Sequence, residues 1–106
     1  MKYRVQRATG AAAVAMTIAP GVAWQLEEVR LHLSGAGADE LLTGTVDAGA
    51  GAAYDVVLIS QNTNGITDYI YQPTRPHMFS SGDELDLACV NTNTVTYGIE
   101  VFYSAI

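Results

Sequence analysis

Apolar residues recur at every second position in the last third of the chain, and this period constrains the fold more than any other feature. Between positions 84 and 89, Leu or Cys stands at each odd position and an acid or Ala at each even one. Between positions 95 and 103, the odd positions are again apolar or aromatic. A period of two is typical of a strand with one buried face, and the Asn and Thr residues at 91–94 favour a turn. We therefore predict that these two segments form an antiparallel hairpin.

A second apolar run, at positions 11–19, follows a basic segment. This combination resembles a secretory signal peptide. Within the run, however, Val14, Met16 and Ile18 alternate with smaller residues, which favours a strand. The run is also too short for a membrane span, because Pro20 interrupts it. We expect a strand here, no cleavage and no membrane association.

The segment Trp24–Ser34 keeps the same period but changes phase at Glu27 and Glu28. One extra residue there, a β-bulge, restores a single apolar face. The alternative is a carboxylate pair for acid–base chemistry or metal binding. Neighbouring side chains on a strand point to opposite faces, so the bulge is the favoured interpretation.

The middle of the chain combines glycine-rich and strongly apolar segments. Asp47–Ala53 contains no bulky side chain, which indicates a flexible link or the close approach of another backbone. Tyr54–Gln61 is almost continuously apolar after Asp55, as in a strand covered on both faces. Asn64-Gly65 is a strong short-range signal for a hairpin turn.

These segments together predict the fold class. About eight strands are separated by turn signals at roughly 8–12-residue spacing, as in an antiparallel sandwich or barrel. No helical period of 3.6 residues is present, and 106 residues correspond to one domain. We predict a single-domain, all-β protein spanning residues 1–106. Its expected core includes Leu58, Leu85, Leu87, Ile99 and Val101.

The charges are few and unevenly placed. The net charge is −6 and the pI about 4.5, so the chain lacks the basic face that phosphate backbones require, and we expect no nucleic-acid binding. Lys2, Arg4 and Arg7 are three of its five basic residues, whereas all eleven acids lie beyond them. This segment, about residues 1–7, is either an edge strand whose charges face water or an arm that reaches an acidic surface.

No residue pattern indicates catalysis or a bound cofactor. The two histidines, His32 and His77, lie far apart in sequence and without the clustered ligands that a metal requires. Cys89 lies in register with apolar strand residues, which indicates a buried small residue rather than a reactive thiol. The acids at 83, 84 and 86 fit a solvated strand edge and not the twelve-residue calcium loop. Trp24 and the tyrosines either pack in the core or an interface, or form an aromatic platform for sugar rings.

Four segments carry a resemblance to a known group of proteins. Trp24–Ser34, Ala53–Leu58, Ser81–Leu85 and Asn91–Tyr103 resemble small jelly-roll structural proteins of tailed bacteriophages. Capsid decoration ("cement") proteins are the group that these segments resemble most. The likeness covers the chain from about Trp24 to its end.

The resemblance implies a jelly-roll β-sandwich, often trimeric, that binds the major capsid protein on the outer surface of the virion and bridges neighbouring shell subunits. No catalytic, metal or cofactor residue can be carried over, so we expect a non-enzymatic protein. The residues that we expect to contact partners are Lys2, Arg4, Arg7 and Trp24. The main alternative is a tail- or fibre-associated jelly-roll module that binds carbohydrate or a receptor, and a weaker one is a cupin-like enzyme. The same sandwich serves all three functions.

Overall fold

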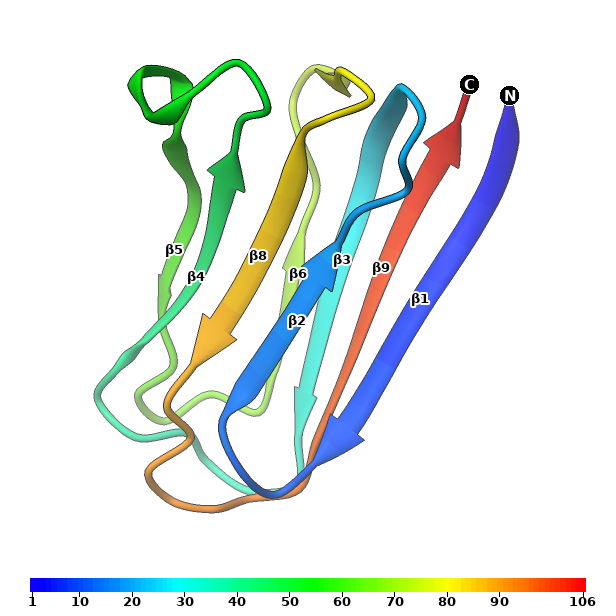
Figure 1. The fold of residues 1–106 in the computed structure, drawn as a ribbon. Helices are drawn as coiled ribbons and strands as arrows, with labels where there is room; N and C mark the ends of the chain where they lie inside the picture. The colour runs from blue at the N-terminus through cyan, green and yellow to red at the C-terminus, as the bar shows by residue number, and fades with distance from the viewer.

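The alternating segments form nine β-strands and one turn of 3-10 helix in the computed structural model, which describes residues 1–106 (Figure 1). The elements are β1 (Lys2–Gly10), β2 (Val14–Ile18), β3 (Trp24–Leu33), β4 (Leu41–Asp47), η1 (Ala52–Tyr54), β5 (Val56–Asn62), β6 (Asp68–Tyr71), β7 (His77–Phe79), β8 (Glu84–Cys89) and β9 (Tyr97–Ala105).

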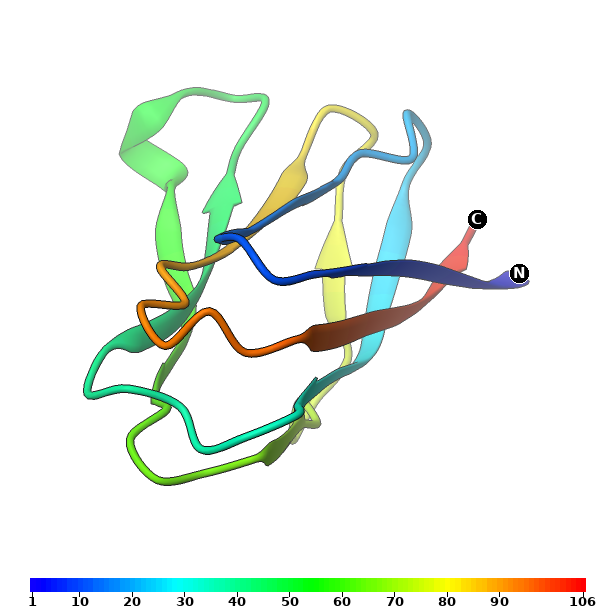
Figure 2. The ribbon, with the colours of Figure 1, turned by 90° about the horizontal axis from the view of Figure 1, so that it is seen from below.

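The strands are divided between two antiparallel sheets that lie face to face (Figures 1 and 2). Sheet A has the order β1-β9-β3-β6, with β7 also paired to β3, and sheet B has the order β2-β8-β4-β5. The strands β6 and β7 continue one another along β3, separated by a segment that contains Pro73 and Pro76. Proline cannot donate to a ladder. If β6 and β7 count as one interrupted strand, the two orders are 1-8-3-6 and 2-7-4-5, which is the jelly-roll arrangement. The predicted all-β sandwich is confirmed.

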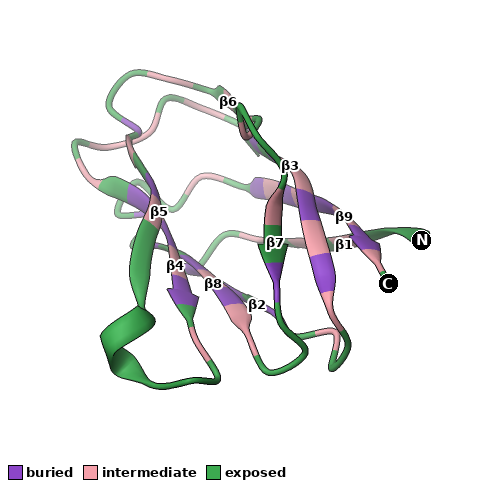
Figure 3. Cartoon of the chain, turned by 90° about the horizontal axis from the view of Figure 1, so that it is seen from above, coloured by how far each residue is buried: buried purple, intermediate pink, exposed green.

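The core lies between the sheets and follows the alternation (Figure 3). Four of the five predicted core residues, Leu85, Leu87, Ile99 and Val101, are completely or almost completely buried. The fifth, Leu58, is only partly buried. Its neighbour Ile59 is buried instead, because the β4–β5 register shifts at this point and changes which residues of β5 face inward.

The β-bulge predicted in β3 is present. The register of β3 against β9 shifts between Leu26 and Glu28. The apolar residues on either side of this shift all point into the core, although they differ in parity: Trp24, Leu26, Val29, Leu31 and Leu33. The extra residue thus keeps a single buried face along a ten-residue strand.

Three predictions about the pairing and position of strands were wrong. The strands β8 and β9 do not form a hairpin, because β8 pairs with β2 and β4 whereas β9 pairs with β1 and β3. The turn at Asn64-Gly65 exists, with a φ of 75° at Gly65, but it leads from β5 in sheet B to β6 in sheet A. The strand β5 is not covered on both faces. It lies at the edge of sheet B, and Val56 and Val57 are 54% and 57% exposed.

The glycine-rich tract makes the close backbone approach that its composition indicated. A Cβ added to Gly49 would lie 2.9 Å from the carbonyl oxygen of Gly82. Asp83 fixes the two loops together, because its carboxylate accepts hydrogen bonds from the backbone N–H groups of Gly49 (3.0 Å) and Ser80 (2.9 Å). The tract therefore ties the β4–β5 connection to the loop before β8.

Candidate interaction surfaces

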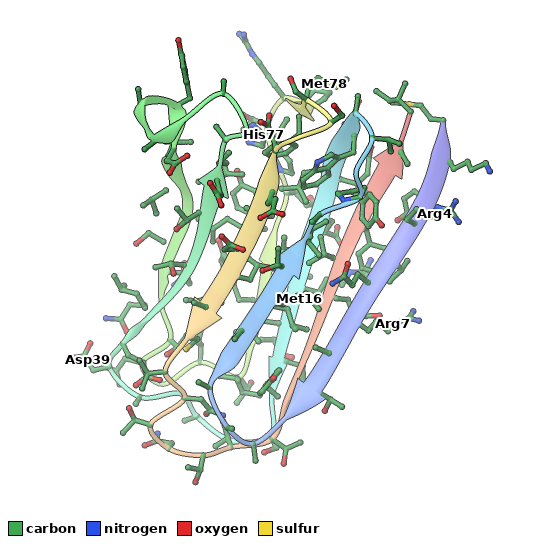
Figure 4. The ribbon with its side chains drawn as sticks, in the orientation of Figure 1. Arg4, Arg7, Met16, Asp39, His77 and Met78 are labelled. Carbon is green, nitrogen blue, oxygen red and sulfur yellow. The ribbon has the colours of Figure 1, made fainter.

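The basic residues near the N-terminus lie on a regular strand. The strand β1 pairs with β9 along its whole length, from Lys2 opposite Ala105 to Gly10 opposite Tyr97. Of the two interpretations of this segment, the structure therefore has the edge strand and not a free arm. Arg4 and Arg7 project from this flank of the molecule (Figure 4). Whether Lys2, Arg4 and Arg7 contact a partner stays a prediction.

Trp24 is a core residue, which corrects its assignment as a partner contact. Its side chain is 0% exposed. The ring stacks on Phe79 at a centroid distance of 4.1 Å and meets the edge of Tyr103 at 5.6 Å. The indole Nε1–H donates a hydrogen bond to the carbonyl oxygen of Asp83 (3.2 Å). No partner can reach this side chain in the folded domain, and it cannot serve as a platform for sugar rings.

A hollow of about 520 Å³ lies on the outer face of sheet A. We call it the sheet A hollow. Gly98, in the central strand β9, forms part of its floor, and a Cβ added there would touch nothing within 4 Å. Ionisable side chains from β1, β3, β6 and β9 surround it: Arg7, Arg30, His32, Asp68 and Glu100. The absence of a side chain at Gly98 thus leaves a depression among longer polar groups.

The ionisable side chains in and beside the sheet A hollow are arranged in pairs. Arg7 Nε lies 2.6 Å from Glu100 Oε2, and His32 Nδ1 lies 2.6 Å from Asp68 Oδ1. Arg30 pairs with Glu28. Its guanidinium also lies over the ring of Phe102, 4.4 Å from the ring centroid, and covers this aromatic residue on the outer face.

Hydrogen bonds lower the pKa of two carboxyl groups, Asp68 in the sheet A hollow and Glu28 beside Arg30. A hydrogen bond from His32, supported by one from Thr67, lowers the pKa of Asp68. A hydrogen bond from Gln72, followed by the interaction with Arg30, lowers the pKa of Glu28. These groups are therefore hydrogen-bond acceptors at neutral pH and poor proton donors.

The other residues considered for chemistry lie apart from the sheet A hollow. His77, on β7, lies beside Tyr71, on β6, with 3.0 Å between its Nε2 atom and the tyrosine hydroxyl oxygen. Cys89 is buried, and burial raises the pKa of its thiol, which donates a long hydrogen bond to Glu40 (3.6 Å). This agrees with the prediction of a structural cysteine. No three His, Cys, Asp or Glu side chains gather in a group that could hold a metal ion.

An uncharged patch lies on the outer face of sheet B, at the end of the sandwich away from the termini. We call it the sheet B patch, and it surrounds a shallow hollow of about 260 Å³. Leu41 and Val90 are its large apolar members, 49% and 68% exposed. Its outward-facing residues are Ala13, Leu41, Thr43, Ala88 and Val90. The sequence analysis missed this patch. Ala88 and Val90 lie two and four positions after Asp86, so the alternation of the strand places them on the same outward face, and this was the available signal.

The links at the same end of the sandwich adjoin the sheet B patch. Figure 2, viewed from this end, shows the links 34–40, 63–67 and 90–96 close to the viewer. Glu40 organises two of them, because its carboxylate accepts hydrogen bonds from the backbone N–H of Thr92 (3.0 Å) and from the Thr92 hydroxyl (2.5 Å). The hydrogen bond from the Thr92 hydroxyl is the main cause of the lowered pKa of Glu40.

The chain matches no protein-family model and no curated protein. The structure contains no helix with the length and hydropathy that a membrane crossing requires. A functional proposal for this chain therefore depends on its surfaces and on the resemblance of its four segments.

Proposed function

We propose that this chain is a non-enzymatic structural protein of a bacteriophage virion, a capsid decoration protein that binds the outer capsid surface. Its partner is the major capsid protein, and its role is to bridge neighbouring shell subunits. The proposal combines the resemblance of the four segments with the surface properties of the domain.

The observation that carries the proposal is the sheet B patch. Leu41 and Val90 expose apolar surface next to small, uncharged side chains. Burial of apolar surface contributes about 25 cal/mol per Å², and exposed apolar patches mark protein contacts. Asp86 and Glu84 lie farther along the same strand, so the patch has a polar border on that side.

A decoration protein stabilises a shell by mass action. It binds the assembled shell more tightly than free subunits and thereby shifts the equilibrium toward the shell. We propose that it does so as a homotrimer, as the resemblance implies. Repeated contacts by linked copies raise the overall affinity without any new type of contact.

The second candidate function is carbohydrate or receptor binding on a tail or fibre, and the sheet A hollow is the observation that favours it. The hollow offers two arginines, a histidine and two carboxylates as hydrogen-bonding groups. Its only aromatic lining residue, Tyr69, is partly buried against the core. The hollow therefore has no open aromatic platform, because Trp24 is also buried and Phe102 lies beneath Arg30. We therefore rank this function below capsid decoration.

Cryo-electron microscopy of purified virions tests the proposal most directly. We expect density for this domain on the outer capsid, with the sheet B patch toward the shell. Density only on the tail, together with binding to a glycan array, would instead support the second candidate.

A binding assay tests the role of the sheet B patch. Purified protein is added to capsids that lack it, and occupancy is measured. We expect Leu41→Asp to lower occupancy strongly. The control is Met78→Asp, which places the same side chain at an exposed apolar position on β7 in the opposite sheet. Equal occupancy by the two variants would contradict a capsid contact through the patch.

A further inference from the structure

The sandwich has four sheet edges, and three of them are protected against pairing with another chain. Lys and Arg residues on β1 discourage its pairing with an edge that is neutral or also basic. The edge formed by β6 and β7 consists of strands of four and three residues with prolines between them. The edge of β2 is partly occupied, because Gln6 Nε2 donates a hydrogen bond to the carbonyl oxygen of Thr17 (3.0 Å).

The fourth edge, β5, lacks these protections. Its seven residues include no charged side chain and no proline. Val56 and Val57 are exposed, and Tyr54 beside them is 68% exposed. The only irregularity is the register shift near Leu58. An exposed apolar edge of this length is a template for another strand.

Acidic residues border the β5 edge. Asp55 directly precedes the strand, and Asp47 ends its partner β4. At the other end, Asn62 Nδ2 donates a hydrogen bond to Asp39 Oδ1 (2.7 Å). No Lys or Arg occurs between Arg30 and Arg75, so neither β4 nor β5 carries a positive charge.

The charges of the two edges select which pairs can form. Two β5 edges placed together would bring acids near acids, and two β1 edges would bring Lys2, Arg4 and Arg7 near the same residues of another copy. Like charges opposed across an interface disfavour a pair, and opposite charges favour it. A β1 edge against a β5 edge is therefore the favoured combination, and both edges belong to this chain.

We propose that the β5 edge of one copy accepts the β1 edge of a second copy, so that the chain self-associates head to tail. The two strands lie on opposite flanks of the domain, with β5 and β1 at the two sides of Figures 1 and 3. Arg4 and Arg7 lie on one flank and Asp39 on the other (Figure 4). Each copy thus offers one donor and one acceptor edge, and such contacts close into a ring where the rotation between copies permits it.

The directions of β1 and β5 place basic and acidic residues at the same end of the proposed contact. In Figure 1, β1 starts at the end that carries the termini, and β5 starts at that same end, after η1. If neighbouring copies are related by rotation about an axis parallel to the strands, the strands of every copy point the same way. The strand β1 of one copy would then run parallel to β5 of the next. Lys2 and Arg4 would then lie at the same end as Asp47 and Asp55.

Two single-edge variants test this contact. Val57→Lys adds a charge to the β5 edge, and Lys2→Glu/Arg4→Glu reverses the charge of the β1 edge. Mass is measured by light scattering at micromolar concentration, with folding checked by circular dichroism. We expect the intact chain to have a mass that is a multiple of 11.3 kDa and each variant to be a single chain.

Ser60→Lys, at another exposed position of the β5 edge, repeats the test if Val57→Lys does not fold. Val90→Lys, the same change at an exposed valine off the edges, keeps the mass of the intact chain.

Mixing the two single-edge variants gives the decisive result. Val57→Lys retains a working β1 edge, and Lys2→Glu/Arg4→Glu retains a working β5 edge. A head-to-tail contact therefore yields a 1:1 species of two chains and nothing larger. A contact between like edges yields no such species. The inference is overturned if the intact chain is monomeric, if either variant keeps the intact mass, or if the mixture stays monomeric.

This inference does not rest on capsid binding, because the measurement uses purified protein without capsids. A monomeric intact chain would also remove the homotrimer from the proposed function. Failure of the inference leaves capsid binding through the sheet B patch untouched. Conversely, a Leu41→Asp variant that self-associates and still decorates capsids fully would overturn the role of the patch alone.

Discussion

Replacement of Trp24 tests its assignment to the core and not to a partner surface. The side chain is fully buried between Phe79 and Tyr103. Trp→Ala substitutions in such sites cost about 3–5 kcal/mol. Folded domains are stable by about 5–15 kcal/mol, so Trp24→Ala should remove between roughly a fifth and all of the stability of the domain. Trp24→Phe keeps a ring in place but loses the hydrogen bond to the Asp83 carbonyl, which is worth about 1 kcal/mol.

Urea unfolding followed by far-ultraviolet circular dichroism measures both effects. Fluorescence is unsuitable because Trp24 is the only tryptophan. For a slope of about 1–3 kcal/mol/M, Trp24→Phe should lower the midpoint by roughly 0.3–1 M, and Trp24→Ala should lower it by more. The matched surface control is Tyr3→Ala, because Tyr3 is an exposed aromatic residue, and surface changes usually stay within about 0.5 kcal/mol. If Trp24→Ala unfolds at the same urea concentration as the intact chain, the core assignment is wrong.

Two further predictions concern the loops at the ends of the sandwich. The carboxylate of Glu40, with a pKa lowered below 4.5 mainly by the hydrogen bond from Thr92, stabilises the fold above its ordinary pKa and loses this effect as the pH falls through the lowered value. The stability difference between the intact chain and Glu40→Gln, measured by urea unfolding, should therefore shrink between pH 7 and pH 3, and a constant difference would contradict this role. Gly49→Ala should destabilise the fold by about 1–3 kcal/mol, because the new Cβ would meet the backbone of Gly82. Gly98→Ala, where the Cβ meets nothing, should leave the thermal midpoint nearly unchanged, and equal effects at the two glycines would refute the close-approach argument.

The faces of the strands could be predicted from the sequence because they depend on local geometry. Side chains alternate on every strand, so the period of two identified the inward residues of β2, β8 and β9. The change of phase at Glu27 and Glu28 located the bulge, since only an extra residue can keep one apolar face. The missing side chains of Asp47–Ala53 indicated either a flexible link or a close backbone approach, and the Gly49 contact shows that the second is present.

The partners of the strands could not be predicted in the same way. A period of two shows which residues face the core but not which strand lies alongside, and in this fold most connections cross between sheets. The assumption that sequence neighbours pair failed for β8 and β9 for this reason. The apolar run in β5 indicated burial, but a covered strand and an unprotected edge strand have the same composition. The surfaces depend on these long-range pairings: Leu41 and Val90 come together because β4 pairs with β8.

The two proposed contacts can coexist, and their coexistence has a measurable consequence. Head-to-tail pairing uses the flanks of the domain, at β1 and β5, and leaves the outer face of sheet B free. Rotation about an axis along the strands places the sheet B patch of every copy at the same end of the ring, away from the termini. The copies then contact the shell together, and linked contacts raise the overall affinity by about 10²–10⁴-fold over one contact. Val57→Lys, which leaves Leu41 and Val90 unchanged, should therefore decorate capsids only at much higher protein concentration than the intact chain. Titration of capsids with both proteins measures the shift, with Val57→Thr as the uncharged control of similar shape. If Val57→Lys is monomeric yet saturates capsids at the same concentration as the intact chain, each copy binds the shell alone and the ring does not contribute to decoration.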